Sequence, residues 1–445
     1  MPKRLCYSIM PFLGAMVATP LCAQTGAGEI LFQNVRVFDG VSPSLSAPTN
    51  VLVRGNVITT IDPALQAGPD TRVIKGEGRT LMPGLIDAHT HIMFSSLPQL
   101  AVLTADLGFM SIAAAREAEA MLLRGFTSIR DLGGPALGLK RAIDQGMTKG
   151  PRIYPAGAMI SQSGGHGDFR LPTAMPAPPG SFDYGERVGA NAIADSPDSV
   201  RQRAREQLAL GATQLKLMAG GGVASSYDPL DVAQYSVPEL RAAVEAAQNW
   251  GTYVTVHAYT PRAIRQAVEA GVACIDHGQL IDEPTAQLMA KNGTWLSLQP
   301  FIEGAGANVY PENSPNRAKQ RQMFAGTDNA YALAKKYRLK VAWGTDTLFS
   351  PQNTRLQGAN LAKMTRWYTP AEALRMATST NAELLALSGP RNPYPGKLGM
   401  VEAGALADLL LVEGNPLEDL TLVADPQKNF VVIMKDGQIY KNMLP

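Results

Sequence analysis

The five histidines of the chain fall where a metal site would need them. They occur as the pair His89-x-His91 and singly as His166, His257 and His277. Four of them end short apolar runs that predict strands, and alternate residues of a strand share one face, so His89 and His91 can bind one cation together. Each imidazole alone is a weak signal, because histidine is also a common satisfied polar group. The arrangement of all five favours a metal centre.

A lysine and an aspartate lie in similar apolar runs. Lys216 is flanked by Leu215 and Leu217, and Asp346 follows Gly344 and Thr345. A carboxylate beside a metal site can take a proton from an attacking water and return it to a leaving group. The alternatives are a lysine that reaches solvent and a carboxylate that only caps the next segment. We treat Asp346 and Lys216 as candidate catalytic residues.

Two further residues, His166 and Tyr259, are expected near the same strand ends, but we do not assign either of them as a metal ligand. His166 lies in the glycine-rich segment 164–168, where the glycines would let a ligand approach the backbone, and Tyr259 follows His257 by two positions. Together with the family resemblance given below, this position implies that both bind substrate, through the carbonyl oxygen of the cleaved bond or a terminal carboxylate. Ordinary barrel packing is the alternative for Tyr259.

The elements that must position these residues alternate between apolar runs and helical stretches, which predicts a parallel sheet wrapped by helices. The eight runs are residues 81–92, 127–133, 152–161, 213–219, 253–259, 273–278, 294–299 and 340–347. Eight such units close into a (β/α)8 TIM-type barrel, whose active site lies at the carboxyl ends of the strands. An open, doubly wound sheet is the alternative.

Several helices between these runs carry signals for their ends. Ser196-Pro197 and Thr260-Pro261 predict two helix starts, and Gly211 and Gly271 predict the matching ends. Thr369-Pro-Ala-Glu372 is typical of a capping box. These signals support the strand assignments between them.

The connection after Ser161 is unusually long and contains a stretch rich in proline and glycine at 171–180. Long barrel loops usually carry function, so we expect this one to form a wall or lid of the active site. Six apolar residues near the strand ends are candidates for the lining of a substrate pocket: Phe94, Met159, Met218, Val223, Leu348 and Phe349. The equal alternative is that they pack in the core of the barrel.

The two ends of the chain are expected to pair in one small β-domain. Residues 30–41, 50–61, 407–412 and 429–440 alternate like strands with one exposed face, and Asp436-Gly437 predicts a hairpin turn. The predicted division is a composite β-domain of residues 24–82 plus 388–445 and a barrel of residues 83–387 that carries the predicted metal site.

Residues 1–23 predict a secretory signal peptide. Lys3 and Arg4 precede an apolar run over 5–17, and Pro20-Leu-Cys-Ala23 is typical of a cleavage region. The run is short for the about 20 residues that a membrane span needs. We therefore expect an exported, periplasmic or secreted protein without stable membrane insertion, whose mature chain begins near Gln24.

Charge and cysteine content exclude several classes of protein. Without Lys3 and Arg4 the basic residues fall from 40 to 38, which equals the 38 acidic residues. A neutral chain gives no reason to expect nucleic acid as a partner. Cys274 would be the one cysteine left after signal cleavage, which excludes a disulfide framework and a cysteine zinc site.

The sequence resembles the amidohydrolase superfamily over nearly the whole mature chain. The matching segments are 83–91 (PGLIDAHTH), 215–216, 256–258, 275–278, 344–346 and 396–408. Lys216, the 164–168 loop and His257-Ala-Tyr259 resemble the branch of imidazolonepropionase-like and prolidase-like metallo-carboxypeptidases. This branch includes the secreted ochratoxin-hydrolysing amidases.

The resemblance implies a binuclear metal centre. Lys216 would react with carbon dioxide to give N6-carboxylysine, an anionic donor that bridges both ions, whereas an ammonium group would be repelled. Nitrogen and oxygen donors without a thiolate suit Zn²⁺, with manganese, cobalt and iron as alternatives. The implied ligands are His89, His91 and Asp346 for the first ion, His257 and His277 for the second, and Lys216 for both.

The resemblance also implies a function and a homo-oligomer. Two cations that share a water would lower its pKa toward about 7 and supply a hydroxide nucleophile, and Asp346 would pass the proton to the leaving nitrogen. We expect release of a C-terminal amino acid from small N-acyl amino acids or dipeptides, including hydrophobic conjugates such as ochratoxin A. The alternatives are a cyclic amide or lactone hydrolase and a non-catalytic periplasmic metal-binding protein.

Overall fold

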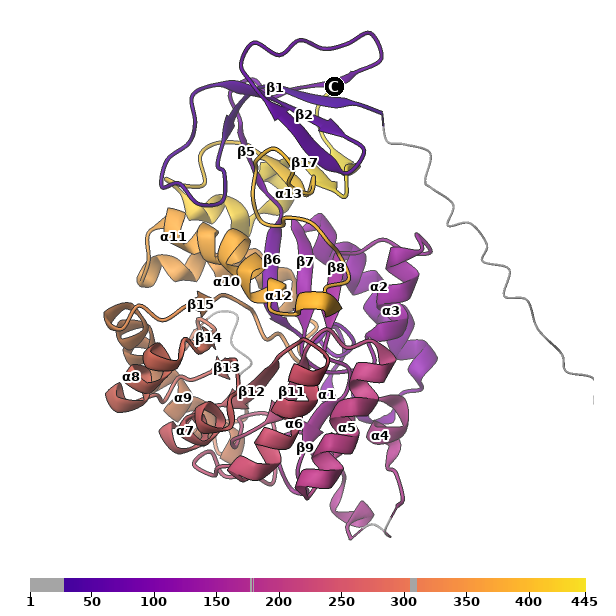
Figure 1. Ribbon diagram of the computed structural model, residues 1–445, viewed down its shortest axis with the longest axis vertical. Helices are drawn as coiled ribbons and strands as arrows, with labels where there is room; N and C mark the ends of the chain where they lie inside the picture. The colour runs from indigo at the N-terminus through magenta and orange to yellow at the C-terminus, as the bar shows by residue number, and fades with distance from the viewer. Residues whose placement is uncertain (1–27, 177, 179, 305–309) are drawn as a thin grey trace, which may run out of the picture.

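The computed structural model describes residues 28–176, 178, 180–304 and 310–445, so the predicted signal peptide at 1–23 lies outside the described residues. Two parallel sheets and the helices around them form the larger part of the molecule, and a mixed sheet lies at one end (Figure 1). Across the described part of the chain, we find no helix with the length and apolar character of a membrane span.

The larger parallel sheet carries most of the predicted strands. Its order is β10 (Asn191–Ile193), β9 (Met159–Ser161), β11 (Leu215–Met218), β12 (Val254–Ala258), β13 (Cys274–His277), β14 (Trp295–Ser297) and β15 (Val341–Ala342). The smaller parallel sheet contains β6 (Leu85–Thr90), β7 (Phe126–Asp131) and β8 (Arg152–Pro155). All eight apolar runs therefore contain strands, in the expected chain order.

The two sheets face each other at both edges but do not form one continuous ladder in the described residues. At one seam Ala88 N donates to Trp343 O at 3.1 Å and Asp346 N donates to His89 O at 2.8 Å. At the other seam Thr213 N donates to Pro155 O at 2.8 Å. The arrangement is of the TIM-barrel type, with isolated hydrogen bonds where the expected closed barrel would have ladders.

Two runs that we expected to form single strands are divided. Residues 152–161 split at Gly157, whose φ of 74° ends β8 and starts β9 in the other sheet. Residues 81–92 split at Gly84 into β5 (Thr80–Pro83) and β6, and a Cβ at Gly84 would lie 2.1 Å from Thr127 Oγ1. β10 was not predicted, because a three-residue strand is too short to show alternation.

Helices cover the outside of the parallel sheets (Figure 1). They are α1 (Gln99–Thr104), α2 (Leu107–Leu123), α3 (Leu137–Asp144), α4 (Tyr184–Val188), α5 (Pro197–Leu210), α6 (Val237–Asn249), α7 (Pro261–Ala270), α8 (Glu283–Asn292), α9 (Pro315–Lys336), α10 (Gln357–Ala362), α11 (Pro370–Arg375) and α12 (Asn381–Ala386). The predicted ends are confirmed: Gly211 and Gly271 cap α5 and α7 with φ of 108° and 93°, and Thr369 forms the capping box of α11.

Segments near the two ends of the described chain share the mixed sheet. Its order is β18 (Gln438–Asn442), β17 (Phe430–Lys435), β16 (Leu409–Val412), β5, β1 (Ile30–Val37), β2 (Thr49–Arg54) and β3 (Val57–Ile61), with β4 (Arg72–Lys75) paired to β1. Asp436 and Gly437 have φ of 53° and 73° in the turn between β17 and β18, which confirms the predicted hairpin. A short helix, α13 (Pro426–Asn429), precedes β17.

Candidate active site

All the predicted site residues line one cavity of about 120 Å³. They lie in or just after different strands of the two parallel sheets, at the carboxyl ends where a barrel site is expected. The residues are His89, His91, His166, Lys216, His257, Tyr259, His277 and Asp346. The structure therefore brings all eight of these side chains to one cavity, while their membership of an active site and their individual roles remain predictions.

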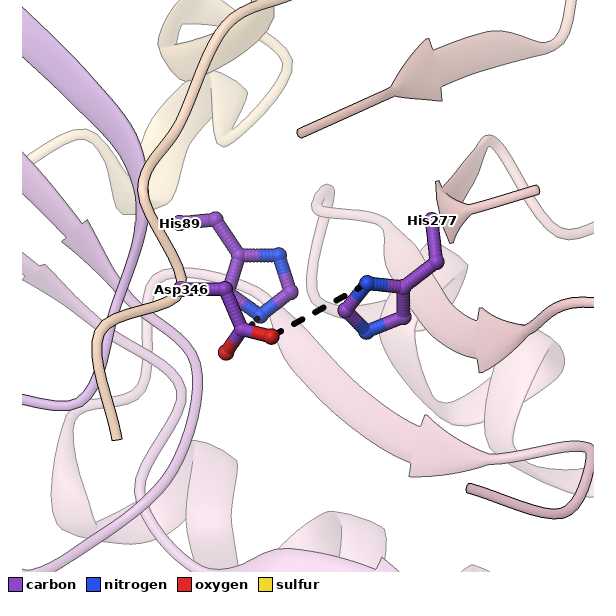
Figure 2. Close-up of side chains that lie close together, drawn as sticks. All are labelled: His89, His277 and Asp346. Carbon is purple, nitrogen blue, oxygen red and sulfur yellow. Dashed lines mark ion pairs between the residues drawn. The ribbon is translucent and has the colours of Figure 1, made fainter. Parts of the chain in front are cut away.

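His89, His277 and Asp346 form a group that could hold a metal ion, because one ligand atom from each lies within 4.8 Å of the others (Figure 2). Asp346 Oδ1 lies 3.3 Å from His89 Nε2 and 3.4 Å from His91 Nε2. Its Oδ2 lies 4.0 Å from His277 Nδ1. Burial alone would raise the pKa of Asp346, but the hydrogen bond with His91 and the charge of His91, whose own pKa is raised, outweigh burial and lower the pKa. Asp346 is therefore an ionised carboxylate.

The backbone at two of these residues is in the left-handed region. The φ angles of His277 and Asp346 are 81° and 48°. This conformation costs a non-glycine residue about 1–3 kcal/mol, and such strain gathers at functional sites. Gly344 allows the segment before Asp346 to lie against β6, because a Cβ there would be 2.6 Å from the Cβ of His89. The close approach of this segment brings Asp346 to the histidines.

Asp87 connects strand β6, which carries His89, to the segment that carries Asp346. Its Oδ1 accepts hydrogen bonds from His89 N at 3.1 Å and Thr345 N at 3.0 Å. Its Oδ2 accepts from Thr345 Oγ1 at 2.7 Å and from Gln357 Nε2 at 2.8 Å. Burial raises the pKa of Asp87 to about 6. This carboxylate fixes the residue before Asp346 relative to the strand that carries His89.

Lys216 is buried and paired with a carboxylate that sequence reasoning did not assign to the site. Its Nζ lies 2.5 Å from Asp276 Oδ2, and both side chains are at most 1% exposed. Asp276 also accepts from Arg130 Nη2 at 2.8 Å and Thr255 Oγ1 at 2.8 Å. Burial lowers the pKa of Lys216, although the charge of Asp276 opposes this shift. At a given pH, a larger fraction of Lys216 is therefore the neutral amine than would be the case for an exposed lysine.

Carbonyl and amide groups fix the ring orientations of the histidines. His91 Nδ1 lies 3.2 Å from Gly133 O, and His257 Nε2 lies 3.1 Å from Gly221 O. His277 Nδ1 lies 2.8 Å from Gln299 Oε1. Such partners hold a ligating imidazole in one orientation and tautomer.

Burial also keeps most of these imidazoles neutral, which is the form that binds a metal. Burial lowers the pKa of His89 and His257 well below the usual value, and that of His277 to about 4. His91 is the exception, because its hydrogen bond with Asp346 outweighs burial and raises its pKa.

His166 and Tyr259 lie beside the second pair of predicted ligands. The His166 ring stacks on that of His257 with a centroid separation of 3.9 Å, and His166 Nδ1 lies 2.7 Å from Ser225 Oγ. The Tyr259 centroid lies 4.9 Å from that of His257 and 5.0 Å from that of His277. Both side chains line the cavity, as a role in substrate binding requires.

Gly222 is expected to be essential for the position of His166. A Cβ at Gly222 would lie 1.9 Å from His166 Cε1, and the opposite face of the ring is already stacked on His257. We expect Gly222→Ala to displace the ring and raise KM by about tenfold, with metal content unchanged. Steady-state kinetics and elemental analysis measure both. Gly138→Ala is the matched control, because nothing lies within 4 Å of a Cβ there. Equal KM values for the two variants would contradict the assignment of His166 as a substrate-binding residue.

Asp131 gives the metal-free protein a pH-dependent stability. Burial raises its pKa to about 7, and its Oδ1 is buried without a hydrogen-bond partner in the described structure. Because the folded state favours the protonated acid, the stabilisation is present below about pH 4 and is lost as the pH rises to about 7. Each pKa unit corresponds to about 1.4 kcal/mol. Across this pH range we therefore expect the free energy of unfolding of the wild type to fall by a few kcal/mol more than that of Asp131→Asn. Urea denaturation across this range measures the difference, and parallel pH profiles would contradict it.

Several residues of the site were not predicted from the sequence. Arg130 and Asp276 lie in the apolar runs 127–133 and 273–278, where a charge is unusual, and this was the available signal. Lys363 and Asn360 reach the cavity rim from α10 and the turn after it. They lie outside the eight strand runs, and no spacing pattern marks them.

Comparisons with known proteins agree with this geometry. The model of the amidohydrolase family matches residues 80–444. Ochratoxinase from Aspergillus niger is 33% identical over 381 residues, which cover 81% of this chain and 75% of that protein. The crystal structure of an amidohydrolase is 36% identical with a TM-score of 0.85, covering 94% of this chain and all of the other. A prolidase crystallised with N-methylphosphonate-L-proline is 34% identical with a TM-score of 0.82, covering 93% of this chain and all of the other.

The chain therefore belongs to the amidohydrolase family. It is a hydrolytic enzyme that acts on amide bonds, and its relatives confirm the expected branch of prolidase-like and ochratoxin-hydrolysing proteins. The family generally uses divalent metals, which agrees with the His89, His277 and Asp346 group.

Proposed function

We propose that the enzyme releases a C-terminal amino acid from N-acyl amino acids or dipeptides with the help of two divalent metal ions, Zn²⁺ by preference. The observation that carries this proposal is the convergence of four histidines, Lys216 and Asp346 on one cavity. The relatives support the substrate class, because one is named for ochratoxin and another was crystallised with a phosphonate derivative of proline.

The chemistry of the donor set supports the binding of divalent metal ions. The set offers imidazoles and an ionised carboxylate. It offers no thiolate, because Cys274, the free cysteine of the described chain, lies 3.7 Å from Arg130 Nη1 and does not line the cavity. Lys216 is the unusual member, since an ammonium group would repel a cation. The lowered pKa of Lys216 favours the neutral amine, which is the form that reacts with carbon dioxide. We therefore propose that Lys216 becomes N6-carboxylysine and supplies an anionic bridge.

Bound metal ions would lower the pKa of a coordinated water and polarise the substrate carbonyl. The residues of the chain supply the rest of the reaction. Asp346 is ionised and 16% exposed, so it can accept the proton of the attacking water and deliver it to the leaving nitrogen. An amide needs this second transfer because an amine anion is a very poor leaving group. His166 and Tyr259 would hold the carbonyl oxygen or the terminal carboxylate.

A substrate panel with metal-loaded enzyme tests this function. N-acyl amino acids, dipeptides, ochratoxin A, hydantoins and lactones are supplied separately, and the released amino acid or opened ring is measured by liquid chromatography. We expect turnover of linear amides that end in a free carboxylate. Turnover of hydantoins or lactones alone would establish a cyclic amide or lactone hydrolase instead. No turnover of any of these compounds would contradict the proposed substrate class.

We also propose that the protein is exported and forms a homo-oligomer. Export depends on residues 1–23, and secretion of a reporter protein fused behind them would test it. Light scattering of the purified mature chain would test self-association, and a monomer mass would contradict it.

A further inference from the structure

A second cavity of about 240 Å³ lies directly beside the active-site cavity. Met159 and Phe169 line both spaces, so these two side chains form the wall between them. Met159 also lies near the predicted metal site, because a Cβ at Gly133 would be 2.2 Å from its Cγ and 3.4 Å from His91 Cε1. The second cavity therefore adjoins the site on the side of His91.

The volumes indicate that a substrate needs both spaces. Ligand-binding cavities commonly measure roughly 300–1,000 Å³. The space around the predicted metal ligands is about 120 Å³, well below this range, and the two cavities together reach it. A substrate with more than a small acyl group must therefore extend beyond the first cavity.

The wall between the cavities consists of side chains that can move. Methionine is unbranched and adapts to irregular space. Phe169 is half-buried on the long loop and makes an edge contact with Phe349, with centroids 5.9 Å apart. Phe349 in turn lies 6.3 Å from Phe94 and has a φ of 53°. A rotation of Met159 or Phe169 would join the two spaces without moving a strand.

The lining of the second cavity suits an apolar group. Most of its side chains are aliphatic or aromatic, namely Phe94, Leu100, Val102, Leu103, Met110, Met159, Phe169, Leu171, Val188 and Phe349. Its charged and phenolic groups already have partners. Arg170 donates to both oxygens of Asp168 at 2.8 and 2.6 Å, Asp183 accepts from Glu186 N, and Tyr184 donates to Ala105 O. A charged ligand group would find no free counter-charge among these residues.

We propose that this second cavity binds a long apolar acyl group of the substrate, which passes Met159 and Phe169 while the scissile amide lies at the predicted metal ligands. This inference rests on the proposed hydrolysis of N-acyl amino acids and adds a substrate class to it, namely amino acids that carry a medium or long aliphatic acyl chain.

The test compares N-octanoyl-L-phenylalanine with N-acetyl-L-phenylalanine. Each buried methylene increases binding by about fourfold. Allowing for incomplete burial, we expect kcat/KM for the octanoyl substrate to exceed that for the acetyl substrate by at least about 50-fold. Ala190→Leu and Leu103→Trp, which fill the second cavity without touching the first, should each reduce this ratio about tenfold and leave the acetyl substrate within about twofold. Arg187→Leu, on the exposed side of α4, is the matched control.

A binding measurement separates this inference from the proposed function. Calorimetry with the Asp346→Asn protein, whose turnover is expected to be greatly reduced, gives Kd for both compounds. Ala190→Leu in that background should weaken binding of the octanoyl compound alone. If the enzyme hydrolyses both substrates but the filled-cavity variants keep the ratio, the second cavity is not an acyl site and the proposed function stands. If neither is hydrolysed but Ala190→Leu weakens octanoyl binding selectively, the cavity assignment stands and the proposed function fails. Equal affinities for the two compounds would overturn the cavity assignment.

Discussion

Asp346→Asn is expected to lower kcat for amide hydrolysis by about 10²- to 10⁴-fold, the usual contribution of a general acid-base group. Asparagine keeps the size of the side chain and tolerates the left-handed φ of 48° at this position, so the backbone should not change. The amide cannot accept the proton of the attacking water, and its oxygen is a weaker metal ligand than a carboxylate. The loss should therefore appear in kcat even at saturating metal.

Release of the amino acid at saturating substrate measures the effect, and thermal unfolding checks the fold. Asp70→Asn is the control, because Asp70 is an exposed aspartate distant in sequence from every predicted site residue. If Asp346→Asn kept more than about a tenth of the wild-type kcat, the residue would not be the proton carrier.

Lys216→Ala is expected to abolish measurable turnover and the tight binding of at least one metal ion. The proposed bridge would be lost, and the remaining histidines could not compensate for its negative charge. In metal-free protein whose Lys216 is not carboxylated, the change also removes the amine that lies 2.5 Å from Asp276 Oδ2, so Arg130 alone would balance that carboxylate. Leaving a buried charge poorly paired costs about 3–5 kcal/mol, and we expect a lower melting temperature as well.

Chemical rescue distinguishes the bridge from a purely structural lysine. Acetate or propionate can enter the space left by Lys216→Ala and supply a carboxylate to the metal ions, so part of the activity and metal content should return at high concentrations of either. Lys340→Ala is the control, because Lys340 is exposed and lies before β15, at the opposite end of the strand from the site. Full metal content and activity in Lys216→Ala without added carboxylate would rule out the bridging carbamate.

The strand ends could be predicted because the relevant signals are local. His257 and His277 follow apolar runs of four or five residues, and those runs became β12 and β13. The break at Gly157 was missed because a glycine within an apolar run is compatible with either a continuous strand or a bend. The structure resolves this through the φ of 74°, which sends the chain from one sheet to the other.

Interactions across the interior could not be predicted in the same way. Arg130 belongs to β7 in the smaller sheet and Asp276 to β13 in the larger one, so their contact depends on how the two sheets face each other. The second cavity is likewise formed largely by α1, α4 and the long loop, which have no strong periodicity. Of the six apolar candidates, Met159, Met218, Val223 and Leu348 line the first cavity, whereas Phe94 and Phe349 line the second.

The most direct measurement is a metal titration of the metal-free enzyme in the presence of bicarbonate, followed by the rate of amino-acid release from an N-acyl amino acid. We predict that activity is absent without metal, rises with added Zn²⁺ and reaches its maximum at two ions per chain, and that Asp346→Asn stays near the baseline throughout. Full activity in the metal-free enzyme, or a maximum at one ion per chain, would contradict a binuclear site built by the four strand-end histidines, Lys216 and Asp346.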